Sequence, residues 1–319
     1  MKGTLIFHSP CFDGIASAVL MADFLEGCGW NNLQFSAANY HLRTTWLSTP
    51  LPDQCAVVDF LYHPDARFWA DHHGTTFLSD VARADFMSKQ PDSALVYDAA
   101  ADSCAGLLWR HLHFAFGFRI ARHEELVQWA EKTDAAHYVS VAEVFAAQAP
   151  AIRINASLAL APNREAYCVR LVQALRGQSL AEVADIPEVR KLSREALERQ
   201  QDGLESFREA AHLTPDAIVV FDVADEAERV NRYSPYYFFP DARYSAGIIR
   251  HRDGALITAM RNPWREFPCA PLGRRCEPLG GGGHPRIGAI ALQAERSGEA
   301  GYILANLLEG IRAFHKHPG

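Results

Sequence analysis

The sequence lacks an uninterrupted apolar run of about 20 residues, the length that a membrane-spanning helix requires, so we expect no membrane span. It also lacks paired cysteines. Its seven cysteines are an odd number, are scattered along the chain and include no Cys-x-x-Cys pair. This usage argues against a disulfide framework and favours a reducing cytoplasm. Because Met1-Lys2-Gly3 leads straight into an apolar segment, we expect no secretory signal.

An excess of basic residues is absent as well. The chain has 31 Lys and Arg against 38 Asp and Glu, which gives a formal net charge of -7. Proteins that bind long duplex nucleic acid without sequence preference rely on basic surfaces. The charge therefore argues against that class and suits short or mononucleotide ligands better.

The chain contains enough apolar residues for more than one core. With 319 residues, 49% of them hydrophobic, about two domains are expected. Up to about residue 175, short apolar segments alternate with helical patterns, as a mostly parallel sheet requires. The expected strands cover residues 5–8, 56–58 and 68–70, and the expected helices cover residues 15–25, 103–112 and 126–130.

From about residue 186 the composition changes. Residues 189–212 are dense in charge and carry apolar residues on one helical stripe, which predicts a long connecting helix. Further strands are expected over residues 217–221, 244–249 and 255–260, and a helix over 300–314. We therefore predict an α/β domain over residues 1–185, a connecting helix over 186–214 and a smaller α/β domain over 215–319.

One group of ionisable side chains stands out, Asp71-His72-His73, which follows an apolar run and precedes Gly74-Thr75. Two imidazoles and a carboxylate are costly to bury without partners, so the triplet is typical of a functional site. Alone, it could equally be a chance sequence on a solvated loop, since the chain has 14 histidines.

Further carboxylates and histidines stand where other apolar elements end. His8 ends the first expected strand, and Asp13-Gly14 opens the helix that follows. Asp59 comes directly after the second expected strand, and Asp134 lies near the end of a helix. Open α/β sheets bind their ligands at such ends. The simpler alternatives are that Asp59 caps the next element and that Asp134 only ends a helix.

In this order, the four positions resemble the motifs of the DHH phosphoesterase superfamily, which is named after its Asp-His-His triplet. A fifth match is the run from Gly280 to Gly283 with His284-Pro285-Arg286, which resembles the glycine-rich motif of the associated C-terminal DHHA1 domain. That motif is typical of the branch with the single-strand-specific exonuclease, the oligoribonucleases and related nucleotide phosphatases. The resemblance implies a mostly parallel N-terminal DHH domain joined by a helical linker to a smaller α/β DHHA1 domain.

The resemblance also implies two divalent ions, Mn²⁺ or Mg²⁺, in the N-terminal domain. Two such ions about 4 Å apart activate a water molecule and neutralise a phosphate. We expect Asp59 to bridge them, His72 to face the phosphate and Asp71 to orient an imidazole through its ring N–H. The expected metal ligands are His8, Asp13, Asp59, His73 and Asp134.

One position departs from the family pattern. The first Asp of the family's Asp-x-Asp pair falls on Cys11, and the spacing from His8 to Asp13 is one residue shorter than in many members. Sulfur is a poor match for Mg²⁺ or Mn²⁺, which prefer oxygen. Cys11 is therefore a thiolate ligand for a borderline metal, a silent neighbour, or the mark of a site that holds one ion tightly and another loosely. The shorter spacing also leaves open whether His8 is a ligand.

In the second domain, four consecutive glycines let the backbone approach a ligand and collect an anion on exposed N–H groups. A flexible loop is the alternative, although apolar segments hold the run at both ends. We expect substrate contacts from this run and from basic side chains near it: Gly281, Gly282, Gly283, His284, Arg261 and Arg286.

Together these features predict a two-domain, metal-dependent phosphoesterase. Its expected substrates are nucleotides or short single-stranded oligonucleotides, bound across an interdomain cleft, and a homodimer is left open. Hydrolysis of polyphosphate or pyrophosphate is one alternative, although that branch usually carries a different C-terminal domain. The other alternative is a nucleotide-binding sensor with little turnover, in which Cys11 has impaired the metal site.

Overall fold

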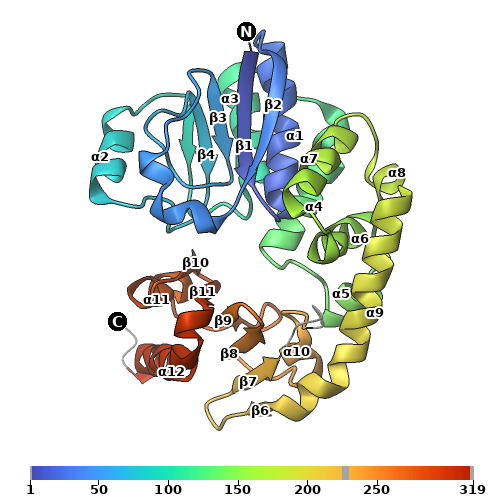
Figure 1. Ribbon diagram of the computed structural model, residues 1–319, viewed down its shortest axis with the longest axis vertical. Helices are drawn as coiled ribbons and strands as arrows, with labels where there is room; N and C mark the ends of the chain where they lie inside the picture. Colours follow the sequence, from blue (N-terminus) through green and yellow to red (C-terminus); the bar gives the residue numbers. More distant parts are fainter. Residues whose placement is uncertain (1, 225–229, 317–319) are drawn as a thin grey trace. The chain divides into compact units, whose positions relative to one another are not determined.

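The computed structural model describes residues 2–224 and 230–316, and the chain forms two units (Figure 1). The first unit comprises Met1–Tyr138 and Ala147–Glu195, and the second comprises Val139–Ala146 and Ala196–Gly319. Helix α9, Pro187–Ala210, occupies the segment predicted to connect two domains and leads from the first unit into the second. The boundaries at residues 185 and 214 stay predictions.

The first unit is built on a five-stranded parallel sheet with the order β2-β1-β3-β4-β5. Its strands are β1 Lys2–His8, β2 Asn31–Ala38, β3 Cys55–Val58, β4 Phe68–Asp71 and β5 Leu95–Tyr97. The central strands are apolar at nearly every position because both of their faces are covered. Leu5 and Phe7 belong to one buried cluster and Ile6 and Trp69 to another, as the two-residue period of a strand dictates.

Helices cover both faces of this sheet. They are α1 Phe12–Gly27, α2 Asp80–Ser88, α3 Cys104–Phe116, α4 Glu124–Asp134, α6 Pro150–Ser157, α7 Arg164–Leu175 and α8 Leu180–Ala184. Helix α1 is buried over most of its length and contacts β1, α3, α4 and α7 (Figure 1). On the other face, Phe86 of α2 packs against Trp69, with ring centroids 5.5 Å apart. Among the described residues, no helix is long and apolar enough to cross a membrane.

A buried carboxylate on α1 joins three helical segments of the first unit. Oδ2 of Asp23 accepts hydrogen bonds from Arg122 and His123, at 2.6 Å each, and Oδ1 accepts one from Arg176 at 2.8 Å. The Asp23 side chain is only 6% exposed. Burial alone would raise its pKa, but the hydrogen bonds from His123 and Arg176 hold the pKa below its usual value.

Asp23→Asn is expected to lower the free energy of unfolding by about 2 kcal/mol at pH 7, because it leaves partly buried cations without their charge partner. The folded pKa of Asp23 lies below the unfolded one, so this contribution is complete above the unfolded pKa of about 4 and is lost as pH falls through the folded pKa. Urea unfolding at several pH values measures the difference. Glu26→Gln, which removes only the exposed partner of Arg176, is the control and should cost little.

The second unit is built on a six-stranded sheet with the order β10-β11-β9-β8-β7-β6. Its strands are β6 Ala211–Leu213, β7 Ile218–Ala224, β8 Tyr244–His251, β9 Gly254–Arg261, β10 Gly282–His284 and β11 Ile287–Gln293. β7 and β8 are parallel, and the other pairs are antiparallel. The helices are α5 Val141–Ala146, α10 Ser234–Phe238, α11 Leu272–Cys276 and α12 Ala300–Lys316. Helix α12 buries Ile303, Leu307 and Ile311 against the sheet.

The predicted α/β class, with a parallel sheet first and a smaller α/β unit after a long helix, is confirmed. The sequence patterns missed β2, the edge strand of the first sheet. Only one of its eight residues is fully buried, so its sequence has no continuous apolar run to mark it.

Candidate metal centre

Three neighbouring strands of the first sheet carry predicted site residues at their C-terminal ends. β1 ends at His8, Asp59 follows β3, and β4 ends at Asp71, with His72 and His73 next in the chain. The strands pair in a regular register, so the three ends are level. This edge is where parallel α/β sheets bind their ligands.

Asp59 is the buried centre of this edge. Its side chain is 1% exposed, and among the described residues no nitrogen or oxygen donor hydrogen-bonds its carboxylate, which the thiol of Cys11 reaches. Its φ of 55° lies in the left-handed region, and its N–H donates to the carbonyl of Ala70 over 2.9 Å. Burial raises the pKa of Asp59 well above its usual value, and the charges of Asp13 and Asp71 raise it further. Such a carboxylate is costly unless a cation offsets its charge, and the left-handed backbone is typical of a functional position.

The first turn of α1 brings a second carboxylate close to Asp59. The two oxygens of Asp13 accept hydrogen bonds from the backbone N–H groups of Cys104 and Ala105, at 2.7 and 2.9 Å. Gly14 permits this approach, because a Cβ there would lie 2.2 Å from the last carbonyl oxygen of β1 and 3.2 Å from Oδ2 of Asp59. Burial and a neighbouring carboxylate raise the pKa of Asp13 to about 6.

His72 directs one ring nitrogen toward three carboxylates. Its Nδ1 lies 3.0 Å from the carbonyl oxygen of Ala101, which only accepts, so Nδ1 carries the proton and Nε2 has a lone pair. Nε2 lies 3.5 Å from Asp13, 3.6 Å from Asp59 and 3.5 Å from Asp134. Donor atoms that share one divalent ion, with bonds near 2.1 Å, lie about 3.0–3.6 Å apart. The ligand atoms of Asp13, His72 and Asp134 lie within 4.8 Å of one another, and Asp59 lies beside His72, so these side chains could share a single ion.

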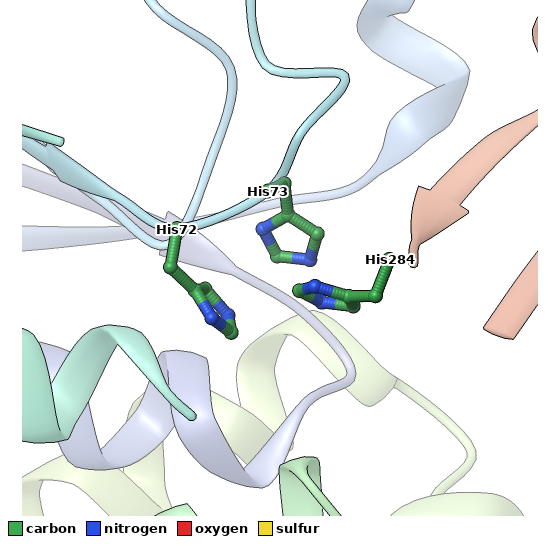
Figure 2. Close-up of side chains that lie close together, drawn as sticks. All are labelled: His72, His73 and His284. Atoms are coloured by element: carbon green, nitrogen blue, oxygen red, sulfur yellow. The ribbon is translucent and has the colours of Figure 1, made fainter. Parts of the chain in front are cut away.

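His72 and His73 follow one another after β4, and their two rings lie apart (Figure 2). The rings have different hydrogen-bond partners. Nδ1 of His73 lies 2.7 Å from Oδ1 of Asp71. Burial alone would lower the pKa of His73, but the charge of Asp71 raises it above its usual value. Burial opposes ionisation of Asp71, but His73 holds the Asp71 pKa below its usual value. Each partner thus favours the charged form of the other.

These contacts favour an exchange of the roles predicted for the two histidines. The sequence assigns metal binding to His73 and the phosphate contact to His72. In the structure, Nε2 of His72 lies among carboxylates, whereas Nδ1 of His73 is bound to Asp71. We therefore infer that His72 is the metal ligand and that His73, oriented by Asp71, contacts the phosphate.

A second group of donor atoms surrounds the other oxygen of Asp59. The ligand atoms of His8, Cys11 and Asp59 all lie within 4.8 Å of one another, and His8 Nδ1 is 3.4 Å from Oδ2 of Asp59. Burial and the charge of His73 lower the pKa of His8 to about 3, so its ring is neutral and able to bind a metal. Asp59 thus offers one oxygen to each group, as a bridging carboxylate must. The residues fit two divalent ions.

No protein-family model matches the chain, and no curated protein matches its sequence. Solved structures do match it. The pGpG-specific phosphodiesterase PggH of Vibrio cholerae is 17% identical, with a TM-score of 0.66 over 97% of this chain and 100% of that chain. RecJ of Thermus thermophilus in complex with Mn²⁺ is 14% identical, with a TM-score of 0.60 over 98% of this chain and 52% of that one. An exopolyphosphatase-related protein of Bacteroides fragilis is 15% identical, with a TM-score of 0.55 over 99% of this chain and 94% of that chain. The chain has the DHH fold.

Within this DHH fold, one aromatic residue lies beside the donor atoms without having been expected from the sequence. Tyr40 begins a short 3-10 helix, Tyr40–Thr44, and its ring centroid is 4.8 Å from that of His8 and 6.2 Å from that of His73. The residue is 37% exposed, but desolvation of its hydroxyl and the charges of Asp71 and Asp59 raise the pKa of that hydroxyl well above the usual value, so it stays a donor. The one sequence feature that could have indicated Tyr40 is its position just after β2, and the sequence patterns did not predict that strand.

The second half of the glycine run, Gly282 and Gly283, belongs to a short strand rather than to a flexible loop. β10 pairs with β11, and a Cβ on Gly281 or Gly283 would lie 2.1 or 2.4 Å from carbonyl oxygens of β11. Gly283 also has a φ of 137°, which favours glycine. Packing therefore requires at least these glycines. The anion contacts predicted for Gly281, Gly282 and Gly283 stay predictions.

The basic residues predicted beside this run share one end of the second sheet. Arg261 ends β9, and its N–H donates to the carbonyl of Arg286 over 2.8 Å. His284 pairs with Ile287, which in turn pairs with Met260, the neighbour of Arg261. Arg261 is 6% exposed, whereas Arg286 is exposed. The structure thus brings His284, Arg261 and Arg286 together within the DHH chain's second unit.

Proposed function

We propose that the protein is a divalent-metal-dependent phosphoesterase that hydrolyses phosphate esters of nucleotides or short oligonucleotides. The observation that carries this proposal is Asp59, a buried carboxylate whose two oxygens face two separate groups of donor atoms and accept no hydrogen bond from a described nitrogen or oxygen donor. The DHH fold, shared with a pGpG phosphodiesterase and with RecJ, supports the same reaction class.

The donor atoms suggest which residues would hold the ions. His72, Asp13 and Asp134 would complete one shell, His8 and Cys11 the other, and Asp59 would belong to both. The ions, Mn²⁺ or Mg²⁺, would supply a hydroxide nucleophile at neutral pH and neutralise the phosphate. RecJ structures of the same fold contain either ion.

The remaining residues of the site act on the substrate. The charge of Asp71 raises the pKa of His73 and so favours its protonated form, which can donate a hydrogen bond to a phosphate oxygen as negative charge develops there. Asp71 fixes the ring through Nδ1 and leaves Nε2 as the donor to substrate. Tyr40 adds a hydroxyl donor beside His8 and His73.

We further infer a short, 5′-phosphorylated dinucleotide as the favoured substrate. The net charge of -7 disfavours long nucleic acid, and the fold neighbour that matches over its whole length is specific for pGpG. Purified protein with Mn²⁺ should release mononucleotide from pGpG faster than phosphate from 3′-phosphoadenosine 5′-phosphate or from a short polyphosphate. Faster release from polyphosphate would favour the polyphosphatase alternative. Nucleotide binding without turnover of any of the three would favour the sensor.

His284→Ala is expected to raise KM for the nucleotide by about tenfold or more, since it removes a donor placed among basic residues of the second unit. Metal stoichiometry should not change, because every ligand proposed above belongs to the first unit. His212→Ala, on exposed β6, is the control. An equal loss of metal and nucleotide binding in the His284 variant would contradict the proposed role.

A further inference from the structure

Cys11 occupies a position where three different donor atoms meet. It precedes α1 in extended conformation, with φ of -144° and ψ of 134°, and its side chain makes no capping hydrogen bond. Its Sγ, a ring nitrogen of His8 and a carboxylate oxygen of Asp59 lie within 4.8 Å of one another. Among the described residues, the buried Nδ1 of His8 has no hydrogen-bond partner, and the thiol of Cys11 is the donor that reaches the Asp59 carboxylate. The group therefore offers one nitrogen, one sulfur and one oxygen around a common point.

Cys104, a second cysteine near the site, serves for comparison with Cys11. Cys104 is fully buried, and its Sγ donates to the carbonyl oxygen of Ala70 over 3.3 Å. Cys11 is only partly buried and faces the donor atoms of His8 and Asp59. Cys104 thus bonds to the backbone, whereas the thiol of Cys11 is directed at the carboxylate of Asp59.

The two groups of donor atoms that Asp59 joins differ in the elements that they offer to a metal ion. Asp13, Asp134 and Asp59 surround Nε2 of His72 with oxygen, which suits Mn²⁺ and Mg²⁺. The group with Cys11 has only one carboxylate, and Mg²⁺ rarely accepts sulfur. A coordinating thiol binds as a thiolate, which suits thiophilic first-row ions.

We propose that Cys11 is a thiolate metal ligand and that the His8-Cys11-Asp59 position selects a thiophilic divalent cation, such as Zn²⁺ or Co²⁺, over Mg²⁺. The two metal positions would then hold different ions. The inference rests on the proposed function only in taking this cluster as a metal centre, and it does not require turnover of any substrate.

Cobalt absorption spectroscopy on the full chain tests this proposal without an activity assay. Co²⁺ titrated into the wild-type protein should produce a thiolate-to-cobalt charge-transfer band in the near ultraviolet. Cys11→Ser should abolish the band, whereas Cys28→Ser, which removes an exposed cysteine, should leave it intact. Cys11→Asp should abolish the band and bind Mg²⁺ about tenfold more tightly or better, because it restores an oxygen donor.

Alkylation of the wild-type protein provides a second readout that does not depend on how the variants fold. Bound Zn²⁺ should slow the modification of Cys11 by iodoacetamide at least tenfold, as measured by peptide mass spectrometry, while exposed Cys28 reacts at the same rate. A cobalt complex without the band, a band that survives Cys11→Ser, or unchanged alkylation with Zn²⁺ bound would each overturn the proposal. An intact band without nucleotide hydrolysis would overturn the proposed function and leave the ligand assignment standing.

Discussion

Asp59→Asn is expected to lower kcat for nucleotide hydrolysis by at least about a thousandfold, because several kcal/mol of transition-state stabilisation depend on the ions that Asp59 would bridge. An amide has nearly the shape of a carboxylate but no charge, so the variant should fold. Its oxygen and NH₂ group cannot serve as an anionic bridge between two ions. Initial rates with pGpG and Mn²⁺ measure the effect, and Asp53→Asn, at an exposed position of the same unit, is the control.

The same substitution should stabilise the metal-free protein. The pKa of Asp59 in the folded state lies well above its usual value, first because of burial and then because of neighbouring carboxylates. Ionised Asp59 therefore lowers the free energy of unfolding. This destabilisation is absent below the unfolded pKa of about 4 and grows as pH rises toward the folded pKa. In EDTA at neutral pH, Asp59→Asn should therefore unfold with a free energy higher by about 1 kcal/mol or more. A variant that is both inactive and less stable would mean that Asp59 is a structural residue.

Alanine variants of His72 and His73 are expected to fail in different ways. His72→Ala removes the nitrogen that lies 3.5–3.6 Å from three carboxylates and should lose one of the two bound ions. His73→Ala removes a charged donor that Asp71 orients and should keep both ions, while kcat falls by about a hundredfold to a thousandfold.

Native mass spectrometry in Mn²⁺, together with kcat, separates these two expectations. His63→Ala, a buried histidine whose Nε2 lies 3.1 Å from the carbonyl of Thr49, controls for the loss of a buried imidazole away from the centre. If His73→Ala loses an ion and His72→Ala does not, the roles first predicted from the sequence are right.

The sequence was sufficient for the class of fold, and the site residues that it predicts for the first unit lie close together in the structure. Apolar strands that stop at His8, Asp59 and Asp71 place these residues at one sheet edge, because parallel strands end together. Asp13 and Asp134 could be predicted as further residues of the site, because each lies at one end of a helix next to that edge.

The roles of His72 and His73 could not be predicted from order alone. Which ring turns toward the carboxylates depends on acceptors far away in the sequence, and Ala101, 29 residues on, fixes the His72 tautomer. Tyr40 was missed because it follows an edge strand with a weak apolar pattern. The steric need for glycine at Gly281 and Gly283 could not be predicted, because the close packing against β11 is visible only in three dimensions.

The most direct test of the central claim is the metal content of the protein after equilibration with Mn²⁺ and removal of free ion. The account predicts close to two Mn²⁺ per wild-type chain and at most one in Asp59→Asn, since Asp59 contributes to both groups of donor atoms. Two ions bound by the Asp59 variant as tightly as by the wild type would contradict the account, and so would a wild-type chain that binds nucleotide but no metal.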